Sequence, residues 1–499
     1  MLPKPQPALA PNTIAYESSP LVKPTGFREY DARWLLGEEI NLMGLQALGM
    51  GLGTLLGELG VERRIVTGHD FRSYSTSVKL ALVSGMLSAG CEVHDIGLAV
   101  SPMAYFAQFD LDVPAVAMVT ASHNENGWTG VKMGAERPLT FGPDEMGRLR
   151  DIVLAGKFDD SGGGTYRFIE GMAERYRAAL TDRPKLRRKI RAVVACGNGT
   201  AGAFAPQVLA AIGLDVVPLD CDLDYTFPRY NPNPEDLKML AAIAEKVVES
   251  GADVGFGFDG DGDRCGVIDN NGEAIFADKV GVMLARDLSA IHANARFVVD
   301  VKSTGLFKTD PVLAANGAET DYWKTGHSYI KRRVNALGAL AGFEKSGHFF
   351  FNAPIGRGYD DALVAAIAVC DMLERAGDKS LAALRDALPQ TWGSPTMSPH
   401  CPDEVKYEVV GRVVDAITAM KAAGETLAGQ PIAELITING VRVVNPDGTW
   451  GLVRASSNKP ELVVVVESPV SEARMREMFH AIDAILRQHR EVGEYNQTI

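Results

Sequence analysis

The chain has 499 residues, of which 46% are hydrophobic and 23% are charged, as in ordinary globular proteins with buried cores. Its net charge of −13 argues against nucleic acid or an anionic membrane as the main partner. The six cysteines form no Cys-x-x-Cys pair, and no apolar run approaches the roughly 18 residues of a membrane span. We therefore expect about three or four domains, a cytoplasmic location, and no structural zinc.

Alternating helix and strand patterns fill the first third of the chain. Residues 1–20 are rich in Pro and Ala, lack the order of a signal peptide, and are predicted to form a flexible tail. The elements expected next are a helix over 37–59, a strand over 64–68, a helix over 75–89, and strands over 93–97 and 115–120. This order predicts a mostly parallel sheet covered by helices, which ends at the glycine run 161–164.

The alternation then restarts twice. The second unit is expected to contain strands over 189–195 and 215–218 and helices over 205–212 and 234–250. The third is expected to contain a strand over 297–301, an apolar stretch over 339–342 and a helix over 362–375. Residues 389–399 contain three prolines and no periodicity, which indicates a linker.

The last part of the chain has a different pattern. It predicts helices over 403–423 and 471–489 and strands over 435–444, 449–455 and 461–467. The predicted fold class is therefore α/β, with three tandem α/β domains on mixed, mostly parallel sheets and a C-terminal α+β domain on an antiparallel sheet. The expected segments are the tail 1–20, domain 1 at 21–164, domain 2 at 165–273, domain 3 at 274–391 and domain 4 at 392–499.

A run of alternating aspartates and glycines follows a predicted buried strand. It reads Asp259-Gly260-Asp261-Gly262-Asp263-Arg264. Three carboxylates on so short a loop repel one another unless a cation sits among them, and oxygen ligands suit Mg²⁺. An EF-hand loop would need Gly and Glu where Arg264 and Asn270 stand, and a solvated acidic turn does not need Arg264. The run therefore predicts a metal site.

A second polar loop follows the predicted strand over 115–120. In open α/β sheets such loops carry catalytic residues, which makes Ser122 a candidate nucleophile or phosphate carrier. The alternative is a capping or turn serine. His123 is not assumed to act as its base, because no Gly-x-Ser-x-Gly elbow is present. Lys132 lies ten residues further on and is a candidate general acid or base.

Three further loops carry polar groups. His327 lies between a glycine and a serine, and is a catalytic candidate or a structural histidine. Glu344 and Ser346 are two apart before a short apolar run, and either bind sugar hydroxyls or form a polar turn. The last loop is either a phosphate site or a solvated basic turn. It reads Arg454-Ala455-Ser456-Ser457-Asn458-Lys459.

Taken together and in this order, the loops resemble those of the α-D-phosphohexomutase family, most closely its bacterial phosphomannomutase/phosphoglucomutase members. The family sequences are Thr-x-Ser-His-Asn, Asp-Gly-Asp-Gly-Asp-Arg, Glu-x-Ser-Gly-His and Arg-Ala-Ser, and all four occur here. The resemblance extends from about residue 27 to the last predicted helix. It implies four domains arranged around a central cleft.

The resemblance also implies an activity. It is the interconversion of hexose 1-phosphate and hexose 6-phosphate, with mannose or glucose as the sugar, through a phosphoserine and a hexose 1,6-bisphosphate. One Mg²⁺ per chain and glucose 1,6-bisphosphate as activator are implied as cofactors. The implied partner is the hexose phosphate, with no nucleic acid or membrane, on a monomer or weak homodimer.

The resemblance assigns roles by position. The implied catalytic residues are Ser122, which carries the phosphoryl group, and Lys132, Arg33, Arg264 and His327, which orient it or move protons. The implied metal ligands are phosphorylated Ser122 with Asp259, Asp261 and Asp263. The implied sugar ligands are Glu344 and Ser346, on O3 and O4, with His348 close by. The implied phosphate ligands are Arg454, Ser456, Ser457 and Asn458, supported by Tyr30 and Lys302.

The sequence departs from the family pattern at a few positions. Glu125 and Thr129 stand where the family usually has Pro and Asn, and Trp34 stands where it has Gly. Ser457 and Asn458 replace the Asn-Thr that commonly follows Arg-Ala-Ser. None of these departures removes a charged catalytic group, but they bear on turnover and on sugar preference.

Other functions stay open at this point. A phosphoglucosamine mutase shares the Glu-x-Ser-Gly-His sequence. A phosphatase of the haloacid-dehalogenase kind would phosphorylate an aspartate of Asp-x-Asp, although Gly262-Asp263 stands where that motif has Thr or Val. A sugar-phosphate- or Ca²⁺-binding protein with the same fold and no catalysis is the third alternative.

Overall fold

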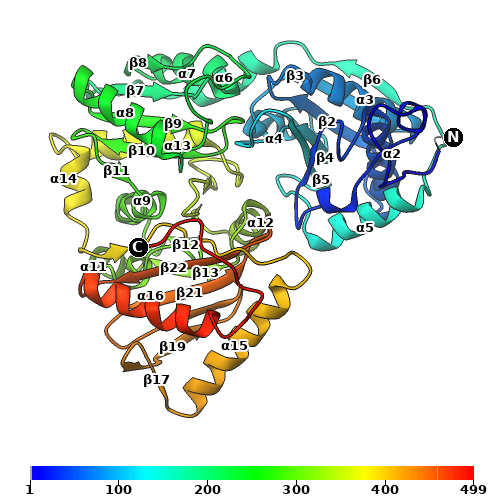
Figure 1. Cartoon of the computed structure of the whole chain (residues 1–499). Helices are drawn as coiled ribbons and strands as arrows, with labels where there is room; N and C mark the ends of the chain where they lie inside the picture. The colour runs from blue at the N-terminus through cyan, green and yellow to red at the C-terminus, as the bar shows by residue number, and fades with distance from the viewer. Residues whose placement is uncertain (1–2, 458) are drawn as a thin grey trace. The chain divides into compact units, whose positions relative to one another are not determined.

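The computed structural model describes residues 3–457 and 459–499. The chain divides into two compact units. The first unit comprises Met1–Ala277 and Ser346–Ala382, and the second comprises Asp278–Lys345 and Ala383–Ile499. One division therefore falls inside the sequence predicted to bind sugar, between Lys345 and Ser346. Figure 1 labels the elements in chain order.

The first sheet of the first unit is mixed, with strand order β1-β5-β4-β2-β3-β6. Strand β2 pairs in parallel with β3 and β4, and β5 runs antiparallel to both β4 and β1. The strands are β1 (Ala32–Leu35), β2 (Arg64–His69), β3 (Glu92–Leu98), β4 (Ala115–Val119), β5 (Trp128–Gly134) and β6 (Thr165–Phe168). The helices are α1 (Ile14–Ser18), α2 (Leu42–Glu58), α3 (Ser75–Ser88), α4 (Ser101–Asp110), α5 (Pro143–Ala155) and α6 (Met172–Thr181).

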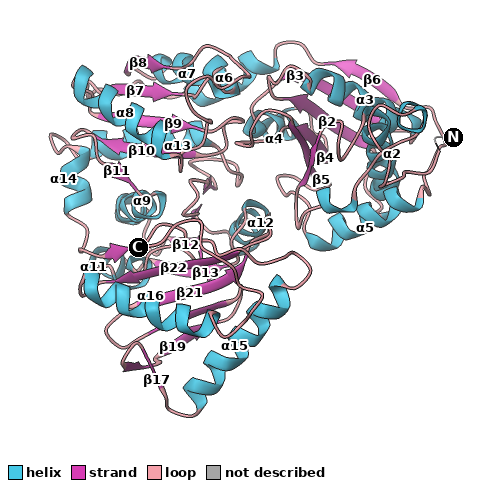
Figure 2. Ribbon diagram, in the orientation of Figure 1, coloured by secondary structure: helices cyan, strands magenta, loops and turns pink. Residues whose placement is uncertain are grey.

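Helices α2, α3 and α5 flank this sheet in Figure 2 and share one hydrophobic core with it. Helix α2 begins at Leu42 rather than near residue 37, because the side chain of Asn41 caps it by accepting a hydrogen bond from Gly44 N at 2.8 Å. Asn41 Nδ2 also donates to Tyr16 O and Ser19 O, so the N-terminal segment is tied to the start of α2.

Two departures from the family pattern meet in this core. Trp34 on β1 is opposite Thr129 on β5, and both are buried. The Trp34 indole donates to Lys23 O at 2.8 Å and meets the edge of Phe27. A Cβ on Gly26 would lie 1.9 Å from the indole nitrogen, so only glycine fits there. The two departures are thus a cross-strand pair in the core.

The second sheet of the first unit has strand order β11-β10-β9-β7-β8. Strand β7 is parallel to β8 and β9, whereas β10 returns antiparallel to β9. The strands are β7 (Arg191–Ala195), β8 (Asp215–Leu219), β9 (Val254–Phe258), β10 (Cys265–Asp269) and β11 (Ala274–Ile275). The helices are α7 (Ala205–Ala211) and α8 (Leu237–Ser250).

Helix α8 approaches β9 closely because alternate residues of β9 are glycines. The side chains of Ile243 and Val247 on α8 occupy the space that a Cβ on Gly255 would need, 2.5 and 2.8 Å away. Phe256 and Phe258 alternate with the glycines and are fully buried. This packing fixes the end of β9, from which the aspartate loop leaves.

The segment Ser346–Ala382 contributes β15 (Phe349–Phe351) and α13 (Ala362–Arg375) to the first unit. Helix α13 contacts β10 and α7. It has the bounds predicted for it, because Asp361 caps its first turn by accepting hydrogen bonds from Leu363 N and Val364 N.

The second unit begins with the parallel strands β12 (Arg296–Asp300), β13 (Glu319–Trp323) and β14 (Ala341–Phe343), with β12 between the other two. Its first helices are α9 (Ala277–Ile291), α10 (Leu306–Thr309), α11 (Pro311–Ala315) and α12 (His327–Leu337). The short helix α14 (Leu381–Asp386) contains the last division of the chain.

The C-terminal part is a five-stranded antiparallel sheet of order β16-β22-β21-β20-β19 with its own core. The strand predicted over 435–444 is two strands, since a turn at Gly440 separates them. The segment predicted as a linker contributes the edge strand β16 (Trp392–Gly393). The remaining elements are β17 (Thr426–Leu427), β18 (Gln430–Pro431), β19 (Glu434–Ile436), β20 (Val441–Val444), β21 (Trp450–Ala455), β22 (Leu462–Ser468), α15 (Lys406–Ala422) and α16 (Glu472–Leu486).

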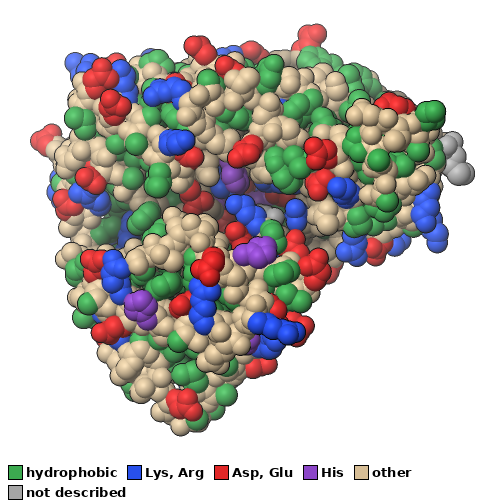
Figure 3. All heavy atoms as spheres, viewed as in Figure 1, with side chains coloured by type: hydrophobic (Ala, Val, Ile, Leu, Met, Phe, Trp, Pro, Cys, Tyr) green, Lys and Arg blue, Asp and Glu red, His purple; other side chains and the backbone are tan. Residues whose placement is uncertain are grey.

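The predicted fold class is confirmed: mixed, mostly parallel sheets are followed by a C-terminal antiparallel sheet with helices. None of the helices in the described part of the chain combines the length and apolar composition needed to cross a bilayer. Acidic and basic side chains are interspersed over the face drawn in Figure 3. The predicted domain boundaries and the flexibility of residues 1–20 remain predictions.

The glycine pattern of β9 gives a test of this packing. Gly255→Ala should lower the melting temperature, because its Cβ would displace α8 at an overpacking cost of about 1–3 kcal/mol. Gly147→Ala in α5 is the matched control, since no atom lies within 4 Å of its new Cβ and alanine favours a helix by about 0.5–1 kcal/mol. Scanning calorimetry of both variants measures the difference. Equal melting temperatures would contradict the close packing of α8.

Candidate active site

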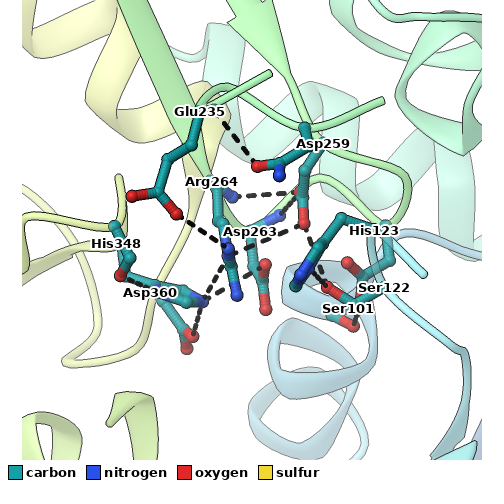
Figure 4. Close-up of polar contacts among 12 residues, drawn as sticks. Ser101, Ser122, His123, Glu235, Asp259, Asp263, Arg264, His348 and Asp360 are labelled. Atoms are coloured by element: carbon teal, nitrogen blue, oxygen red, sulfur yellow. Dashed lines mark hydrogen bonds and ion pairs between the residues drawn. The ribbon is translucent and has the colours of Figure 1, made fainter. Parts of the chain in front are cut away.

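The aspartate loop joins β9 to β10 and turns all three carboxylates inward. Asp259, Asp261 and Asp263 are each fully buried, and one ligand oxygen from each lies within 4.8 Å of the others. Asp259 Oδ1 accepts hydrogen bonds from Asp263 N at 3.1 Å and Arg264 N at 3.2 Å, which closes the loop. Figure 4 shows Asp259 and Asp263 beside Ser122.

The carboxylate oxygens that remain suit a divalent cation. Oδ1 of Asp261 and Oδ1 of Asp263 are buried and accept no hydrogen bond from any residue the structure describes. Buried anionic oxygens without donors are costly unless a cation binds them. Three clustered carboxylates, two of them with an oxygen that has no hydrogen-bond donor, fit a hard ion such as Mg²⁺.

Lys132 on β5 is the cation that faces this cluster. Its Nζ donates to Asp261 Oδ2 at 2.8 Å and to Asp263 Oδ2, and the side chain is buried. Ser101, the first residue of α4, holds the same Asp261 oxygen through its hydroxyl at 2.6 Å. Lys132 thus neutralises part of the negative charge that the loop concentrates.

Burial and the repulsion among the carboxylates give Asp259, Asp261 and Asp263 different pKa values. Burial raises the pKa of Asp259 well above its usual range, and the carboxylates of Asp263 and Asp261 raise it further. Burial acts most strongly on Asp261 and Asp263 too and in the same direction, but Lys132 together with Ser101 lowers the pKa of Asp261, and Lys132 together with His348 and Arg264 lowers that of Asp263 strongly. Burial lowers the pKa of Lys132, yet these two carboxylates raise it well above its ordinary value. Asp259 is therefore the carboxylate least compensated by the chain.

Ser122 faces that carboxylate from the end of β4. Its hydroxyl donates to Asp259 Oδ2 at 3.1 Å and lies 3.2 Å from His123 Nδ1. Its backbone has a φ of 52°, in the left-handed region that few non-glycine residues adopt, while its N donates to Thr120 Oγ1 at 2.8 Å. The predicted serine loop and the predicted metal loop therefore meet where Ser122 Oγ donates to Asp259 Oδ2.

Arg264, at the end of the aspartate loop, faces the segment that returns from Ser346. Arg264 Nε lies 4.0 Å from Asp259 Oδ2 and 3.4 Å from Nε2 of His348. The same His348 nitrogen lies 3.5 Å from Asp263 Oδ1 and 4.0 Å from Asp360 Oδ2 (Figure 4). Ser346 Oγ lies 3.1 Å from the other ring nitrogen of His348. Ser346 and His348, predicted to bind sugar, thus lie beside the metal loop.

Two residues near the start of the chain were also predicted to serve the site. Arg33 on β1 donates to Asn124 Oδ1 at 2.7 Å and to Asp31 Oδ2 at 3.2 Å, so it contacts the serine loop through Asn124. Tyr30, just before β1, is buried. Glu125, one of the departures from the family pattern, is exposed to solvent.

The second unit holds Lys302, His327 and Glu344 at the ends of its parallel strands. Glu344 follows β14 and accepts a hydrogen bond from Gly326 N at 2.5 Å, which fixes the turn before His327. His327 begins α12 and is buried. Lys302 Nζ lies 3.9 Å from Asp300 Oδ2. Burial raises the pKa of Asp300, an effect that Lys302 opposes and Glu344 reinforces.

The basic loop after β21 is also in the second unit. Arg454 is buried, and it donates through Nε to Asn439 Oδ1 at 2.8 Å and through Nη2 to Ser457 Oγ at 3.0 Å. Ser456 is buried, and its hydroxyl accepts a hydrogen bond from Lys459 N at 3.3 Å. Asn458 lies outside the described residues.

Sequence reasoning missed several residues that position these groups. Asn439 accepts hydrogen bonds from both Arg454 and Thr325 N, and Arg442 donates to the carbonyls on either side of Lys302, Val301 O at 2.7 Å and Ser303 O at 2.6 Å. Ser101 was also missed. These residues occur in ordinary strand, turn or helix-start sequence, so nothing in the local pattern identifies them.

Four domain families match consecutive parts of the chain, described as phosphoglucomutase/phosphomannomutase alpha/beta/alpha domains I, II and III and the C-terminal domain. They match residues 24–160, 167–272, 276–392 and 404–485.

Individual relatives match over nearly the whole chain. A phosphomannomutase/phosphoglucomutase of Pseudomonas putida is 33% identical over 461 residues, covering 91% of this chain and 94% of its own. A phosphoglucomutase of Neisseria meningitidis serogroup A is 32% identical, covering 91% and 96%. A crystal structure of a phosphoglucomutase/phosphomannomutase family protein from Burkholderia thailandensis matches with a TM-score of 0.84 and 28% identity, covering 96% of this chain and 100% of its own.

Mg²⁺ should raise the melting temperature of the protein, because an ion that binds only the folded chain stabilises it, by about 2.7 kcal/mol at a hundred times its Kd. Asp261→Asn should remove most of this rise, and EDTA should reverse it in the unaltered protein. Asp222→Asn, an exposed aspartate outside the cluster, is the matched control. A rise of equal size in Asp261→Asn would mean that the cation binds elsewhere.

Proposed function

The chain belongs to the phosphoglucomutase/phosphomannomutase family, and from that membership and the site we propose that it is a phosphohexomutase. It interconverts hexose 1-phosphate and hexose 6-phosphate, with mannose or glucose as the sugar. The reaction runs through a phosphoserine at Ser122 and a hexose 1,6-bisphosphate. The observation that carries this proposal is the hydroxyl of Ser122 directed at Asp259, inside a cluster of buried carboxylates built for a cation.

Phosphoryl transfer needs positioning and charge neutralisation more than covalent chemistry. In the first half-reaction, the free sugar hydroxyl attacks the phosphorus on Ser122, the bond from phosphorus to Ser122 Oγ breaks, and the hydroxyl proton passes to a base. The bisphosphate then exchanges its two ends, and Ser122 Oγ attacks the other phosphate. Ser122 is thereby phosphorylated again and the isomeric monophosphate is released.

The chain's own groups divide this work. Lys132 and Arg264 border the carboxylate cluster and offset negative charge near Ser122. His348 lies beside Asp263 and Arg264, where an imidazole is suited to moving the hydroxyl proton. Arg33 contacts the serine loop through Asn124. We propose that Lys132, Arg264, His348 and Arg33 act as catalytic groups.

A cation completes the site. Asp259, Asp261 and Asp263, with phosphorylated Ser122, would hold one Mg²⁺ per chain, which when bound neutralises charge on the transferring group. Glucose 1,6-bisphosphate would phosphorylate any chain that has lost its phosphate. The buried Oδ1 atoms of Asp261 and Asp263, which lack hydrogen-bond donors among the described residues, support the ion, and family membership supports the bisphosphate.

We propose that the second unit holds the phosphate that is not transferred. Arg454 and Ser457 already form one hydrogen-bonded group, and Ser456 lies between them in sequence. A guanidinium with neighbouring hydroxyls suits a phosphate. Glu344 and Ser346 would bind the sugar hydroxyls, and Lys302 and Tyr30 would support the phosphate. His327 would orient the phosphoryl group or move protons. One phosphate site can serve both ends of the bisphosphate in turn.

The function is tested by the products formed. With Mg²⁺ and a trace of glucose 1,6-bisphosphate, the protein should convert mannose and glucose 1-phosphates to 6-phosphates. Ser122→Ala should lower kcat by more than about 10³-fold, because it removes the group that carries the phosphoryl. Ser88→Ala on α3 is the control. Glucosamine 1-phosphate is included as a third substrate. Free phosphate without isomer would indicate a hydrolase, and no product from any sugar would contradict the proposal.

The phosphate site predicts a separate kinetic effect. Arg454→Lys should raise KM about tenfold or more for both the 1-phosphate and the 6-phosphate, because lysine lacks the planar fork. A smaller effect on kcat is expected. Arg412→Lys on α15, which alters the ion pair of Arg412 with Glu491, serves as the control. A rise in KM for only one of the two isomers would argue against a site that accepts both ends.

A further inference from the structure

The loop that carries Ser122 is held by its backbone carbonyls. The carbonyl oxygens of three successive residues each accept a hydrogen bond from a side chain elsewhere in the first unit. Arg72 Nη2 donates to Ser122 O at 3.0 Å and to Asn124 O at 2.6 Å. Asn231 Nδ2 donates to His123 O. Loop carbonyls more often face water, so three directed side-chain contacts in a row need an explanation.

Arg72 is itself rigidly placed. Arg72 is 3% exposed, and its Nη1 donates to Asp70 Oδ2. Asp70 is 0% exposed, and its Oδ1 accepts a hydrogen bond from Ser75 Oγ at 2.5 Å. Asp70 N also donates to Val119 O at 2.9 Å, at the end of the strand that leads to the loop. The pair is therefore tied to β4 and α3 as well as to the loop.

The Arg72–Asp70 pair also binds a backbone N–H group of the loop. Asp70 Oδ2 accepts a hydrogen bond from Ala121 N at 3.2 Å, one residue before Ser122. Arg72 and Asp70 thus form hydrogen bonds with the backbone before, at and after Ser122. The left-handed backbone of Ser122, with φ of 52°, is a conformation that a non-glycine residue keeps only when its surroundings fix it.

From these contacts we infer that Arg72 and Asp70, with Asn231, are positioning residues for phosphoryl transfer. The inference rests on the proposed function, since it concerns Ser122 as the phosphate carrier. During each turnover Ser122 loses one phosphoryl group and gains another, so the charge on its side chain changes twice. A clamp on the backbone carbonyls holds Oγ at the same point in both states, because it does not use the side chain at all.

The clamp also has a consequence for water. If the loop shifts, a water molecule reaches the phosphorus on Ser122 in place of the sugar hydroxyl. The water oxygen then bonds to phosphorus as the bond from phosphorus to Ser122 Oγ breaks, the proton lost by the water passes to Ser122 Oγ, and inorganic phosphate is released. A weakened clamp should therefore lower mutase turnover and raise the phosphate released per turnover.

The test uses the full-length protein with Mg²⁺ and glucose 1,6-bisphosphate. Arg72→Lys keeps a positive charge opposite Asp70, but its single nitrogen cannot replace both Nη1, which donates to Asp70, and Nη2, which donates to the two carbonyls. We expect kcat to fall about 10- to 100-fold, as for misplacement of a reacting group by about 1 Å, with KM little changed. The phosphate released per mutase turnover should rise. A loss of fold alone would lower the active fraction without changing that ratio.

Two further variants keep the test decisive. Arg183→Lys alters another arginine–aspartate pair of the first unit, that with Asp371, and should leave kcat and the phosphate ratio unchanged. If Arg72→Lys does not fold, Asn231→Ala removes the donor to His123 O alone and should show the same split between kcat and KM. The clamp would be overturned if the unaltered protein isomerises sugar phosphates and an Asn231→Ala or Arg72→Lys variant matches it in kcat and in phosphate release. An unaltered protein that isomerises nothing would instead overturn the proposed function.

Discussion

Repulsion among three buried carboxylates is the constraint on which the first unit depends. Asp259, Asp261 and Asp263 are fully buried within one short loop, an arrangement that is unfavourable without positive charge. Lys132 compensates Asp261 and Asp263, and the serine loop places its hydroxyl on Asp259. The loop is thus left poised for a cation and a phosphoryl group, and the packing of β9 against α8 holds it there.

Ser122, the proposed phosphate carrier, and its partners come from widely separated parts of the sequence, yet each is fixed by its backbone. Ser122 follows β4, the aspartates join β9 to β10, and His348 lies on a segment that returns to the first unit after residue 346. The division of the chain between Lys345 and Ser346 therefore assigns Glu344 to one compact unit and Ser346 to the other.

Much of this was accessible from the sequence because local patterns dictate local structure. The Gly-Asp alternation predicted the metal loop, and the strand before Ser122 predicted a loop at a strand end. Helix α13 was predicted with its observed bounds because Asp361 caps it. Two errors lay in local signals that the prediction did not use. The cap residue Asn41 makes α2 begin later than predicted, and the turn at Gly440 divides a strand predicted as continuous. The other differences depended on contacts distant in sequence. Trp34 and Thr129 appeared as separate departures, although they are one cross-strand pair. The residues that hold the loops, such as Arg72 and Asn439, carry no local signal.

The central claim is that Ser122 carries a phosphoryl group and gives it to a hexose phosphate. Single-turnover transfer tests it most directly. The protein is phosphorylated with labelled glucose 1,6-bisphosphate, freed of excess reagent, and mixed with unlabelled glucose 1-phosphate and Mg²⁺. The account predicts label on Ser122 by peptide mass spectrometry, then its loss to glucose 1,6-bisphosphate within one turnover. Label on an aspartate, or release of all label as inorganic phosphate, would contradict it.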